Sequence, residues 1–330
     1  MSEVRAKKAL GQHFLVDLNI ARKICDALSG GVRPGTSAGE SAPADMAGNA
    51  GAGADTRVGT DGCADADAET RRGVAASADA RLAADTTAAG APAAAEEERG
   101  GAVPCDVLEV GCGMGVLTQF LLRRGDITTY GAEIDPESVE YLHAHFPEFA
   151  PRLIEGDFLK MNLRERFPRG LKIIGNFPYN ISSQIFFKVL EHRDLVPECV
   201  GMIQKEVAVR IAEPPGSKEY GILSVLLQAW YDIEYLFTVN ETVFNPPPKV
   251  KSAVIRLRRN SVGRLGCDEA LFVKVVKASF GQRRKMIRNS LRTVFGDFGG
   301  AEHPFFTQRA EQLSVADFVQ LTNWVAANRK

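Results

Sequence analysis

Residues 107–122 read VLEVGCGMGVLTQFLL, and this stretch decides the fold. Val107–Val110 is a short apolar run that predicts a buried strand, and residues 116–122 predict the helix that follows it. The glycines between the two let the backbone adopt positive φ angles and come close to a ligand. The N-terminus of the helix adds free N–H groups and the positive end of its dipole. Strand, glycine loop and helix therefore predict a ligand site at the carboxyl end of the strand.

The spacing of the glycines limits the class of ligand. A dinucleotide-binding fingerprint needs its third glycine three residues after the second, and Val116 occupies that position. The loop also lacks the Lys-Ser/Thr pair of the loops that cradle nucleoside triphosphates. The spacing Glu-x-Gly-x-Gly-x-Gly suits a nucleoside ligand without a pyrophosphate.

Two acidic residues follow the next two predicted strands. Residues 127–132 predict a strand that ends at Glu133, the position where doubly wound folds grip a ribose diol. The alternative for Glu133 is a solvated carboxylate beside the next helix, and Asp135 is the expected cap of that helix. Asp157 follows a third strand and could accept a hydrogen bond from an adenine amino group. Without its neighbours it would be interpreted as a turn aspartate.

The tetrad Asn176-Phe177-Pro178-Tyr179 follows a fourth apolar run. Such a tetrad could hold a flat base that carries an amino group, because an Asn carbonyl and a neighbouring backbone carbonyl can accept from both N–H bonds of an exocyclic amine. The proline fixes φ and stiffens the turn, and the ring of Tyr179 offers a face on which the base can stack. The alternative is an ordinary strand end, since the motif is short and turn-like.

Beyond the tetrad, strands and helices alternate to about residue 262, and this predicts a mostly parallel sheet with helices on both faces. Residues 233–239 and 252–257 are the expected late antiparallel strands. From about residue 265 the pattern turns helical and indicates a small C-terminal α-helical domain. Its expected helices are 269–280, 283–295, 308–312 and 315–328, the last of them with a capping box at Ser314 and Asp317.

Residues 31–101 differ from the rest of the chain in composition. They are rich in Ala, Gly, Asp, Thr and Ser and contain almost no large apolar residues. Such a segment cannot bury enough apolar surface to offset its ordering entropy, so we expect a disordered insertion at the surface. An alanine-rich helix over residues 74–98 is the alternative.

The net charge of −1 conceals a strong asymmetry. Residues 31–100 hold 12 acidic and 6 basic residues, whereas residues 245–292 hold 2 acidic and 13 basic ones. A basic cluster of this density, with apolar residues between the charges, indicates contact with a phosphate backbone. The alternative is a solvated helix face. The expected RNA-binding residues are Lys249, Lys251, Arg283, Arg284, Lys285 and Arg288.

The remaining composition favours a cytoplasmic enzyme without a metal. The six cysteines are scattered, with no Cys-x-x-Cys pair and no His/Cys ligand cluster. No apolar run approaches the length of a membrane span, and the N-terminus lacks an apolar signal core.

The glycine loop, Glu133, Asp157 and the tetrad, in this order and spacing, resemble a class I methyltransferase that uses S-adenosylmethionine (SAM) and modifies an amino nitrogen. Further segments resemble the ribosomal RNA adenine dimethyltransferases and, among them, the KsgA/RsmA branch that modifies the small subunit. The segments are KKALGQHFL (7–15), QKEVA (204–208), YGILSV (220–225), FNPPPKVKSAV (244–254) and FGQRRKMIRNSL (280–291).

The resemblance implies a Rossmann-like α/β fold, with helices on both faces of the sheet and a small C-terminal helical domain. It implies four parts: an N-terminal SAM-contacting segment and helix (1–30), the insertion (31–101), the methyltransferase domain (102–262, with 1–30) and a helical RNA-binding domain (263–330). It implies SAM as cofactor and no metal. The implied cofactor-binding residues are His13, Leu15, Gly111, Gly113, Glu133, Asp157 and Asn176.

The resemblance also implies how the target adenine is held. Asn176 would face both the methyl donor and the target amine, Phe177 would act through its backbone carbonyl, and Tyr179 would stack on the base while Phe244 covers the other face. The family more often has Asn at the position of His13, and Leu or Ile at that of Phe177.

The function implied is transfer of methyl groups to N6 of two adjacent adenosines near the 3′ end of 16S rRNA, within the small ribosomal subunit, by a monomeric enzyme. Methylation of large-subunit rRNA or of DNA adenine is the alternative in the same chemistry. A non-catalytic ribosome assembly factor is the alternative from a different class.

Overall fold

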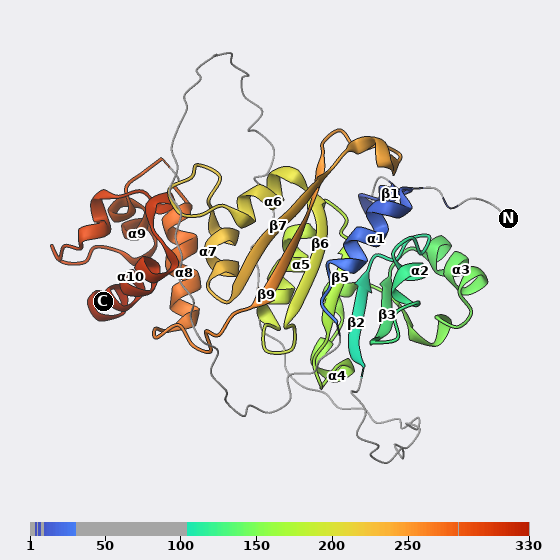
Figure 1. Ribbon diagram of the computed structural model, residues 1–330. Helices are drawn as coiled ribbons and strands as arrows, with labels where there is room; N and C mark the ends of the chain where they lie inside the picture. Colours follow the sequence, from blue (N-terminus) through green and yellow to red (C-terminus); the bar gives the residue numbers. More distant parts are fainter. Residues whose placement is uncertain (1–3, 5, 8–9, 31–103, 283, 330) are drawn as a thin grey trace, which may run out of the picture. The chain divides into compact units, whose positions relative to one another are not determined.

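A seven-stranded mixed β-sheet forms the centre of the computed structural model (Figure 1). The structure describes Val4 and residues 6–7, 10–30, 104–282 and 284–329, so the expected insertion 31–101 and Arg283 lie outside the described residues. The strand order is β4-β3-β2-β5-β6-β9-β7. The strands are β2 (Cys105–Val110), β3 (Ile127–Glu133), β4 (Leu153–Glu155), β5 (Lys172–Asn176), β6 (Glu198–Gln204), β7 (Tyr231–Val239) and β9 (Ser252–Arg259).

The sheet is parallel from β4 to β6 and antiparallel at its other edge. β2 pairs in parallel with β3 and β5, and β6 pairs in parallel with β5. β9 then pairs antiparallel with both β6 and β7. The predicted α/β fold with late antiparallel strands is confirmed. Because the parallel strands all end on one edge, their carboxyl ends and the loops after them gather there.

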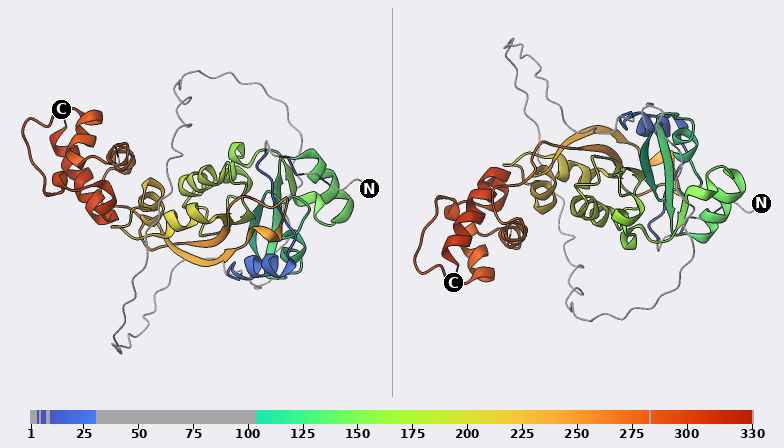
Figure 2. Two further views of the ribbon diagram at one scale, coloured as in Figure 1. Left: turned by 90° about the horizontal axis from the view of Figure 1, so that it is seen from above. Right: turned by 90° about the horizontal axis from the view of Figure 1, so that it is seen from below.

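The buried strands carry apolar residues on both faces, as expected for a parallel sheet covered on both sides. Val107 and Ile174 pack with α1 and α2 on one face. Leu108 and Ile173 pack on the other face, in the apolar cluster that contains residues of α5, α6 and α7. Figure 2 shows blue α1 and yellow-green α5 on opposite sides of the sheet. Both faces of the sheet are therefore covered.

The helices agree with the sequence expectation in position and differ from it in some bounds. They are α1 (Leu18–Asp26), α2 (Thr118–Leu121), α3 (Pro136–His145), α4 (Leu163–Arg166), α5 (Ser182–Glu191), α6 (Lys205–Ala212), α7 (Ile222–Gln228), α8 (Glu269–Phe280), α9 (Ile287–Phe295) and α10 (Val315–Asn328). Short 3₁₀ helices cover Ala150–Arg152, Phe158–Lys160, Glu241–Val243, Pro304–Thr307 and Ala310–Gln312.

Two helices of the C-terminal region differ from their expected form. The helix expected over 283–295 begins at Ile287, because Met286 has an extended backbone and the N–H of Lys285 closes a turn on the carbonyl of Gln282. The segment expected to be helical over 308–312 is a 3₁₀ helix. The capping box at the start of α10 is confirmed, since the Ser314 hydroxyl accepts from the N–H of Asp317.

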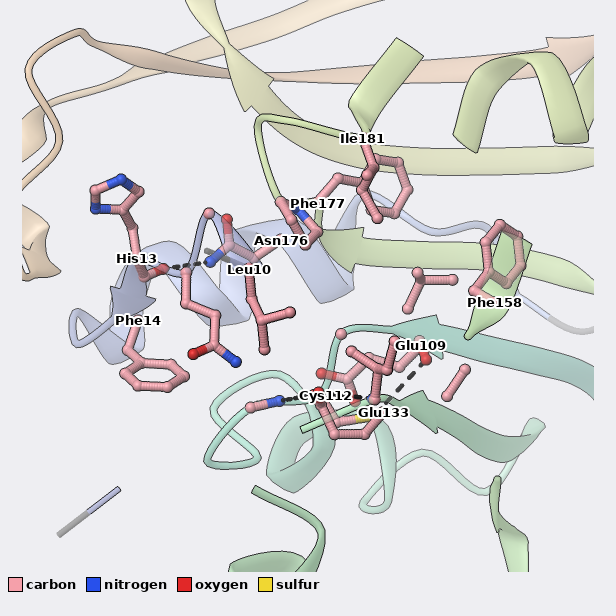
Figure 3. A pocket seen from close by; sticks show the side chains of 18 of the residues that line it. Leu10, His13, Phe14, Glu109, Cys112, Glu133, Phe158, Asn176, Phe177 and Ile181 are labelled. Carbon is pink, nitrogen blue, oxygen red and sulfur yellow. Dashed lines mark hydrogen bonds between the residues drawn. The ribbon is translucent and has the colours of Figure 1, made fainter. Parts of the chain in front are cut away.

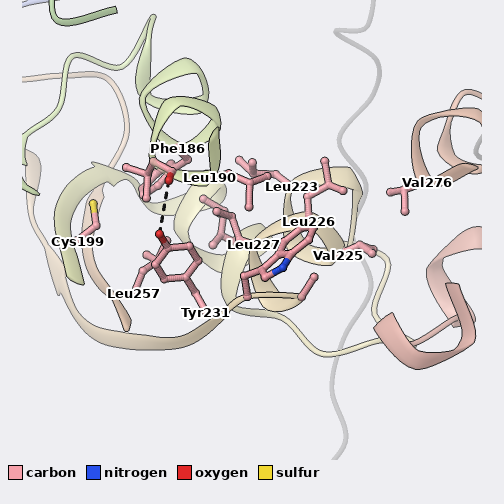
Figure 4. Packing of buried hydrophobic residues seen from close by; sticks show 14 of the residues in the cluster. Phe186, Leu190, Cys199, Leu223, Val225, Leu226, Leu227, Tyr231, Leu257 and Val276 are labelled. Carbon is pink, nitrogen blue, oxygen red and sulfur yellow. Dashed lines mark hydrogen bonds between the residues drawn. The ribbon is translucent and has the colours of Figure 1, made fainter. Parts of the chain in front are cut away.

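The C-terminal helices extend the apolar core of the sheet domain. α8 packs against α7 on one side and against α9 and α10 on the other. Figure 4 shows side chains of α7, among them Leu223 and Leu226, between those of the sheet and Val276 of α8. The ring of Trp230 meets Phe272 edge-on, with 6.0 Å between centroids. The helical region is thus held by burial of a continuous apolar cluster.

A small second sheet anchors the N-terminal segment. β1 (Phe14–Leu15) pairs antiparallel with β8 (Phe244–Asn245). The N–H of Val16 also donates to the carbonyl of Val243, at 2.9 Å. This pairing fixes residues 10–15 at the carboxyl edge of the main sheet, where they line the cavity described below.

Candidate active site

A cavity of about 200 Å³ lies at the carboxyl ends of β2, β3 and β5 (Figure 3). The N-terminal segment 10–15 forms part of its wall, and the loops after these three strands and after β4 form the rest. All the cofactor-binding residues expected from the sequence line this cavity. They are His13, Leu15, Gly111, Gly113, Glu133, Asp157 and Asn176, together with Phe177 and Tyr179 of the tetrad.

The glycine loop has the backbone that its sequence predicts. Gly111, Gly113 and Gly115 have φ angles of 75°, 53° and 75°, which side chains rarely tolerate. A Cβ on Gly115 would lie 2.5 Å from the ring of Phe146, and one on Gly113 would lie 3.0 Å from the ring of Phe14. The loop therefore has no room for side chains at Gly113 and Gly115, and it offers its backbone to the cavity.

Glu133 is held by three backbone N–H groups. Its Oε2 accepts from Gly113 at 2.8 Å, and its Oε1 accepts from Ile134 and Asp135 at 2.9 Å each. The side chain is buried. Burial raises the pKa of Glu133, and the three N–H groups partly oppose this effect. Two carboxylate oxygens have about four acceptor sites, so acceptor capacity remains for a ligand in the cavity.

Glu109 is a second buried carboxyl group in the cavity wall, and the sequence analysis gave it no role. Its Oε2 accepts from the Thr118 hydroxyl at 2.6 Å. Burial raises the pKa of Glu109 to about 8; the Thr118 hydrogen bond lowers it and the charge of Glu133 raises it further. The signal in the sequence was its place in Glu-x-Gly-x-Gly-x-Gly, directly before the glycine loop. Burial therefore favours the protonated form of this carboxyl group, and that form can donate a hydrogen bond.

A polar network ties the N-terminal segment to the start of α3. The Lys7 ammonium contacts Asp135 and lies 3.0 Å from a carboxylate oxygen of Glu137. The Gln12 side chain donates to Asp135 at 3.3 Å. Burial acts to raise the pKa of Asp135, but hydrogen bonds from Lys7, Gln12 and Ser138 outweigh it and the pKa lies below its usual value.

The prediction that Asp135 caps α3 is correct in position and wrong in contact. Asp135 precedes the helix, yet its side chain accepts no backbone N–H of α3. The carboxylate is instead turned toward Lys7 and Gln12 of the N-terminal segment.

Asn176 is oriented by the N-terminal segment. Its Nδ2 donates to the backbone carbonyl of His13 at 2.9 Å, and Figure 3 shows this contact at the cavity. A carbonyl can only accept, so the amide nitrogen must face His13. No described residue donates to the side-chain oxygen of Asn176. That oxygen is therefore available to a ligand that donates.

Tyr179 is held from two sides. Its phenol shares a hydrogen bond of 2.5 Å with the hydroxyl of Ser252, which is fully buried at the start of β9. Its ring lies 5.3 Å from that of His13, at an angle of 31°. The Nδ1 of His13 lies 2.8 Å from the carbonyl of Pro246, so it carries the proton and donates. His13 therefore acts here as a ring against Tyr179, and its imidazole points away from Glu109 and Glu133 (Figure 3).

Phe177 and Phe244 are buried. The ring of Phe177 fills the space over two paired glycines, since a Cβ on Gly175 or Gly201 would lie 2.8 Å or 2.4 Å from it. The ring of Phe244 is 3% exposed, packs with α1 and α2, and does not line the cavity. Phe244 is therefore outside the cavity lining, and its contact with a base stays a prediction.

Asp157 begins the 3₁₀ helix Phe158–Lys160. Its Oδ1 accepts from the N–H of Leu159 at 2.9 Å, and the residue lines the cavity. It is therefore both the turn aspartate and a candidate acceptor for a ligand amine.

The basic residues expected to bind RNA lie outside the cavity. Lys249, Lys251, Arg284 and Lys285 are exposed, whereas Arg283 lies outside the described residues. Arg288 pairs with Glu302 and lies over the ring of Phe306, 5.6 Å from its centroid. Four of the six are thus exposed cations that form no ion pair with any described residue, and their role stays a prediction.

Two kinds of feature are absent from the part of the chain that the structure describes. It contains no group of His, Cys, Asp or Glu residues that could hold a metal ion. None of its helices is long and apolar enough to cross a bilayer.

Comparisons with known proteins point to one kind of enzyme. The family model described as ribosomal RNA adenine dimethylase matches residues 104–327. Ribosomal RNA small subunit methyltransferase A of Parabacteroides distasonis is 61% identical over 218 residues, which are 66% of this chain and 81% of that protein. The protein of the same name from Porphyromonas gingivalis is 47% identical over 326 residues and is covered to 98%, as is this chain. A solved dimethyladenosine transferase from Plasmodium falciparum has a TM-score of 0.55 at 25% identity, over 68% of this chain and 90% of that one.

Proposed function

The chain belongs to the ribosomal RNA adenine dimethylase family, and we propose that it transfers methyl groups from SAM to N6 of two adjacent adenosines near the 3′ end of 16S rRNA. The reaction gives dimethyladenosine during assembly of the small ribosomal subunit. We further propose that the enzyme works as a monomer in the cytoplasm. The observation that carries the proposal is the position of Asn176. Its side chain donates to the N-terminal segment at His13, in the same cavity that Glu133 and the glycine loop line.

The cavity fits SAM. The glycine loop admits a ligand close to its backbone, and Glu133 retains acceptor capacity for the hydroxyls of a ribose. Asp157 can accept from the adenine amine of the cofactor, while Ala132, Ile134 and other apolar residues flank the cavity. Acidic groups suit a ligand with positive charge. When bound, SAM supplies an activated methyl group on a sulfonium centre.

The chain positions and shapes the target amine. The free side-chain oxygen of Asn176 and the backbone carbonyl of Phe177 can accept from the two N–H bonds of an adenine amine, which frees its lone pair for attack. Tyr179, fixed by Ser252 and His13, offers the ring on which the base stacks. No general base of the chain is required, because the proton can leave to water after the methyl group has been transferred.

A substrate panel tests the proposal. The enzyme is incubated with radiolabelled SAM and unmethylated small subunits, free 16S rRNA, large subunits or duplex DNA, beside an Asn176→Ala variant. Label recovered as dimethyladenosine from small subunits, and lost in the variant, supports the proposal. Label only in large subunits or DNA would move the target and keep the chemistry. Absence of label with SAM still bound in calorimetry would instead favour an assembly factor.

A further inference from the structure

A second groove, separate from the cofactor cavity, lies beyond the carboxyl end of β6. Its volume is about 380 Å³. It is lined by Gln204, Lys205, Glu206, Val209, Glu219, Val250 and Lys251. None of these residues takes part in the cofactor cavity described above.

Hydrogen bonds connect this groove to the base-stacking tyrosine. Gln204, the last residue of β6, is the register partner of Ser252, whose hydroxyl holds the phenol of Tyr179. Just beyond this pair, the N–H of Lys205, which follows β6, donates to the carbonyl of Lys251, which precedes β9, at 2.9 Å. The two lysines therefore start from neighbouring backbones, directly beside the pair that fixes Tyr179.

The groove holds two lysines and two glutamates, and both glutamates have ion-pair partners outside the groove lining. Glu206 pairs with Arg210 at 2.9 Å, and Glu219 lies 3.8 Å from the Lys218 ammonium and also accepts from Ser217. Both acidic residues thus have partners of their own. In contrast, neither Lys205 nor Lys251 forms an ion pair with any described residue, and both are exposed. The groove therefore presents two lysines from neighbouring backbones that form no ion pair with a described residue, whereas its two carboxylates have other partners.

The location of this cation pair suits an RNA backbone. Enzymes that act on a base must place it in a pocket out of the stack, so the phosphates on either side of that nucleotide lie near the mouth of the pocket. A lysine ammonium binds phosphate as a point charge. Val250, which is 45% exposed between the charged residues, gives an apolar surface for a neighbouring sugar or base. Positive groups that follow the backbone are a general feature of sites that bind single strands.

We propose that this groove binds the nucleotide that flanks the target adenosine, with its phosphodiester between Lys205 and Lys251. The inference rests on the proposed function, since it assumes that the base on Tyr179 belongs to an RNA strand. It adds Lys205 to the RNA contacts, in a segment that the clustering of basic residues did not include.

Salt-dependent binding tests the groove. The affinity of a short single-stranded oligoadenylate RNA is measured by fluorescence anisotropy between 0.1 and about 1 M salt. The slope of log affinity against log salt concentration is about −0.7 per phosphate contact for single strands. Loss of one contact should therefore lower the affinity by roughly 5-fold at the low-salt end of a tenfold range of salt. We expect this loss for Lys205→Gln and again for Lys251→Gln, with an unchanged affinity for SAM. Lys218→Gln is the matched control, because Lys218 is exposed nearby and already faces Glu219.

Three results would overturn the inference. The first is an RNA affinity of both variants equal to that of Lys218→Gln, and the second is a wild-type enzyme that does not bind the RNA. The third is a loss of polyglutamate affinity in the two variants that equals their loss of RNA affinity, because the groove would then be a general anion site. Failure of the proposed function would give a different result, since no substrate would then contain dimethyladenosine. The RNA affinities are measured without methyl transfer and can be interpreted separately.

Discussion

The hydrogen bond between Ser252 and Tyr179 gives a specific prediction about catalysis. Ser252→Ala removes the hydroxyl that fixes the phenol of Tyr179 at 2.5 Å. Because Ser252 is fully buried, no water replaces the lost hydroxyl without rearrangement of the strands around it. The ring of Tyr179 then keeps its contact with His13 but loses the hydrogen bond of its phenol, and we expect the target adenine to stack on a less well-oriented surface.

The size of the effect follows from the hydrogen bond. A neutral hydrogen bond contributes about 0.5–1.5 kcal/mol, and a buried partner left unsatisfied costs about 1–3 kcal/mol. If this loss falls on the transition state, kcat/KM decreases by roughly 5- to 100-fold, at about 1.4 kcal/mol per factor of ten. Because Ser252 does not line the cofactor cavity, the affinity for SAM should not change.

A double-mutant cycle measures the coupling. Activity on small subunits is compared for wild type, Ser252→Ala, Tyr179→Phe and the double variant, and SAM affinity is measured by calorimetry. Since both changes remove the same hydrogen bond, the double variant should be no worse than the more impaired single variant. Ser279→Ala is the control, because Ser279 is also buried but donates within α8, to the carbonyl of Val275 at 2.8 Å. Additive losses in the double variant, or a Ser252→Ala enzyme as active as the control, would refute the reasoning.

Three further predictions follow from the cavity and its support. Glu133→Gln removes a charged acceptor from three N–H groups and should weaken SAM binding by roughly 10- to 100-fold in calorimetry. The control is Glu155→Gln, at the exposed register partner of Glu133, which should leave SAM binding unchanged. Burial raises the pKa of Glu109 from 4.5 to about 8. The contribution of this carboxyl group to the stability of the fold is therefore fully present below pH 4.5 and is lost as the pH rises through 8. The unfolding free energy of Glu109→Gln should therefore vary less with pH over this window, and an unchanged profile would contradict the assignment. Gly201→Ala should lower the free energy of unfolding by about 1–3 kcal/mol in denaturant titrations, because its Cβ would clash with Phe177. The double variant Gly201→Ala/Phe177→Leu should regain most of that stability.

Local sequence signals were sufficient for the sheet and the cofactor loop. Buried parallel strands are almost continuously apolar, so runs such as Val107–Val110 could be placed to within a residue or two. The glycine loop was readable because positive φ angles leave few alternatives to glycine. The capping box of α10 was readable because its two residues are three apart.

The contacts that shape the site were not readable, because they join distant parts of the chain. Tyr179 and Ser252 are 73 residues apart, and Lys7 and Asp135 are 128 residues apart. Asp135 resembled a helix cap because the local pattern contains no information about the N-terminal segment that meets it. The burial of Phe244 likewise depends on its pairing with β1, which the sequence around it does not indicate.

The central claim is that this cavity places an adenine amine of small-subunit rRNA for methyl transfer. It is tested most directly by mass spectrometry of nucleosides and nuclease fragments from small subunits treated with the enzyme and SAM. We predict N6,N6-dimethyladenosine at two adjacent positions near the 3′ end of 16S rRNA, and unmodified rRNA with Asn176→Ala. Methyl groups on another base, or modification that persists in the Asn176→Ala variant, would contradict the account.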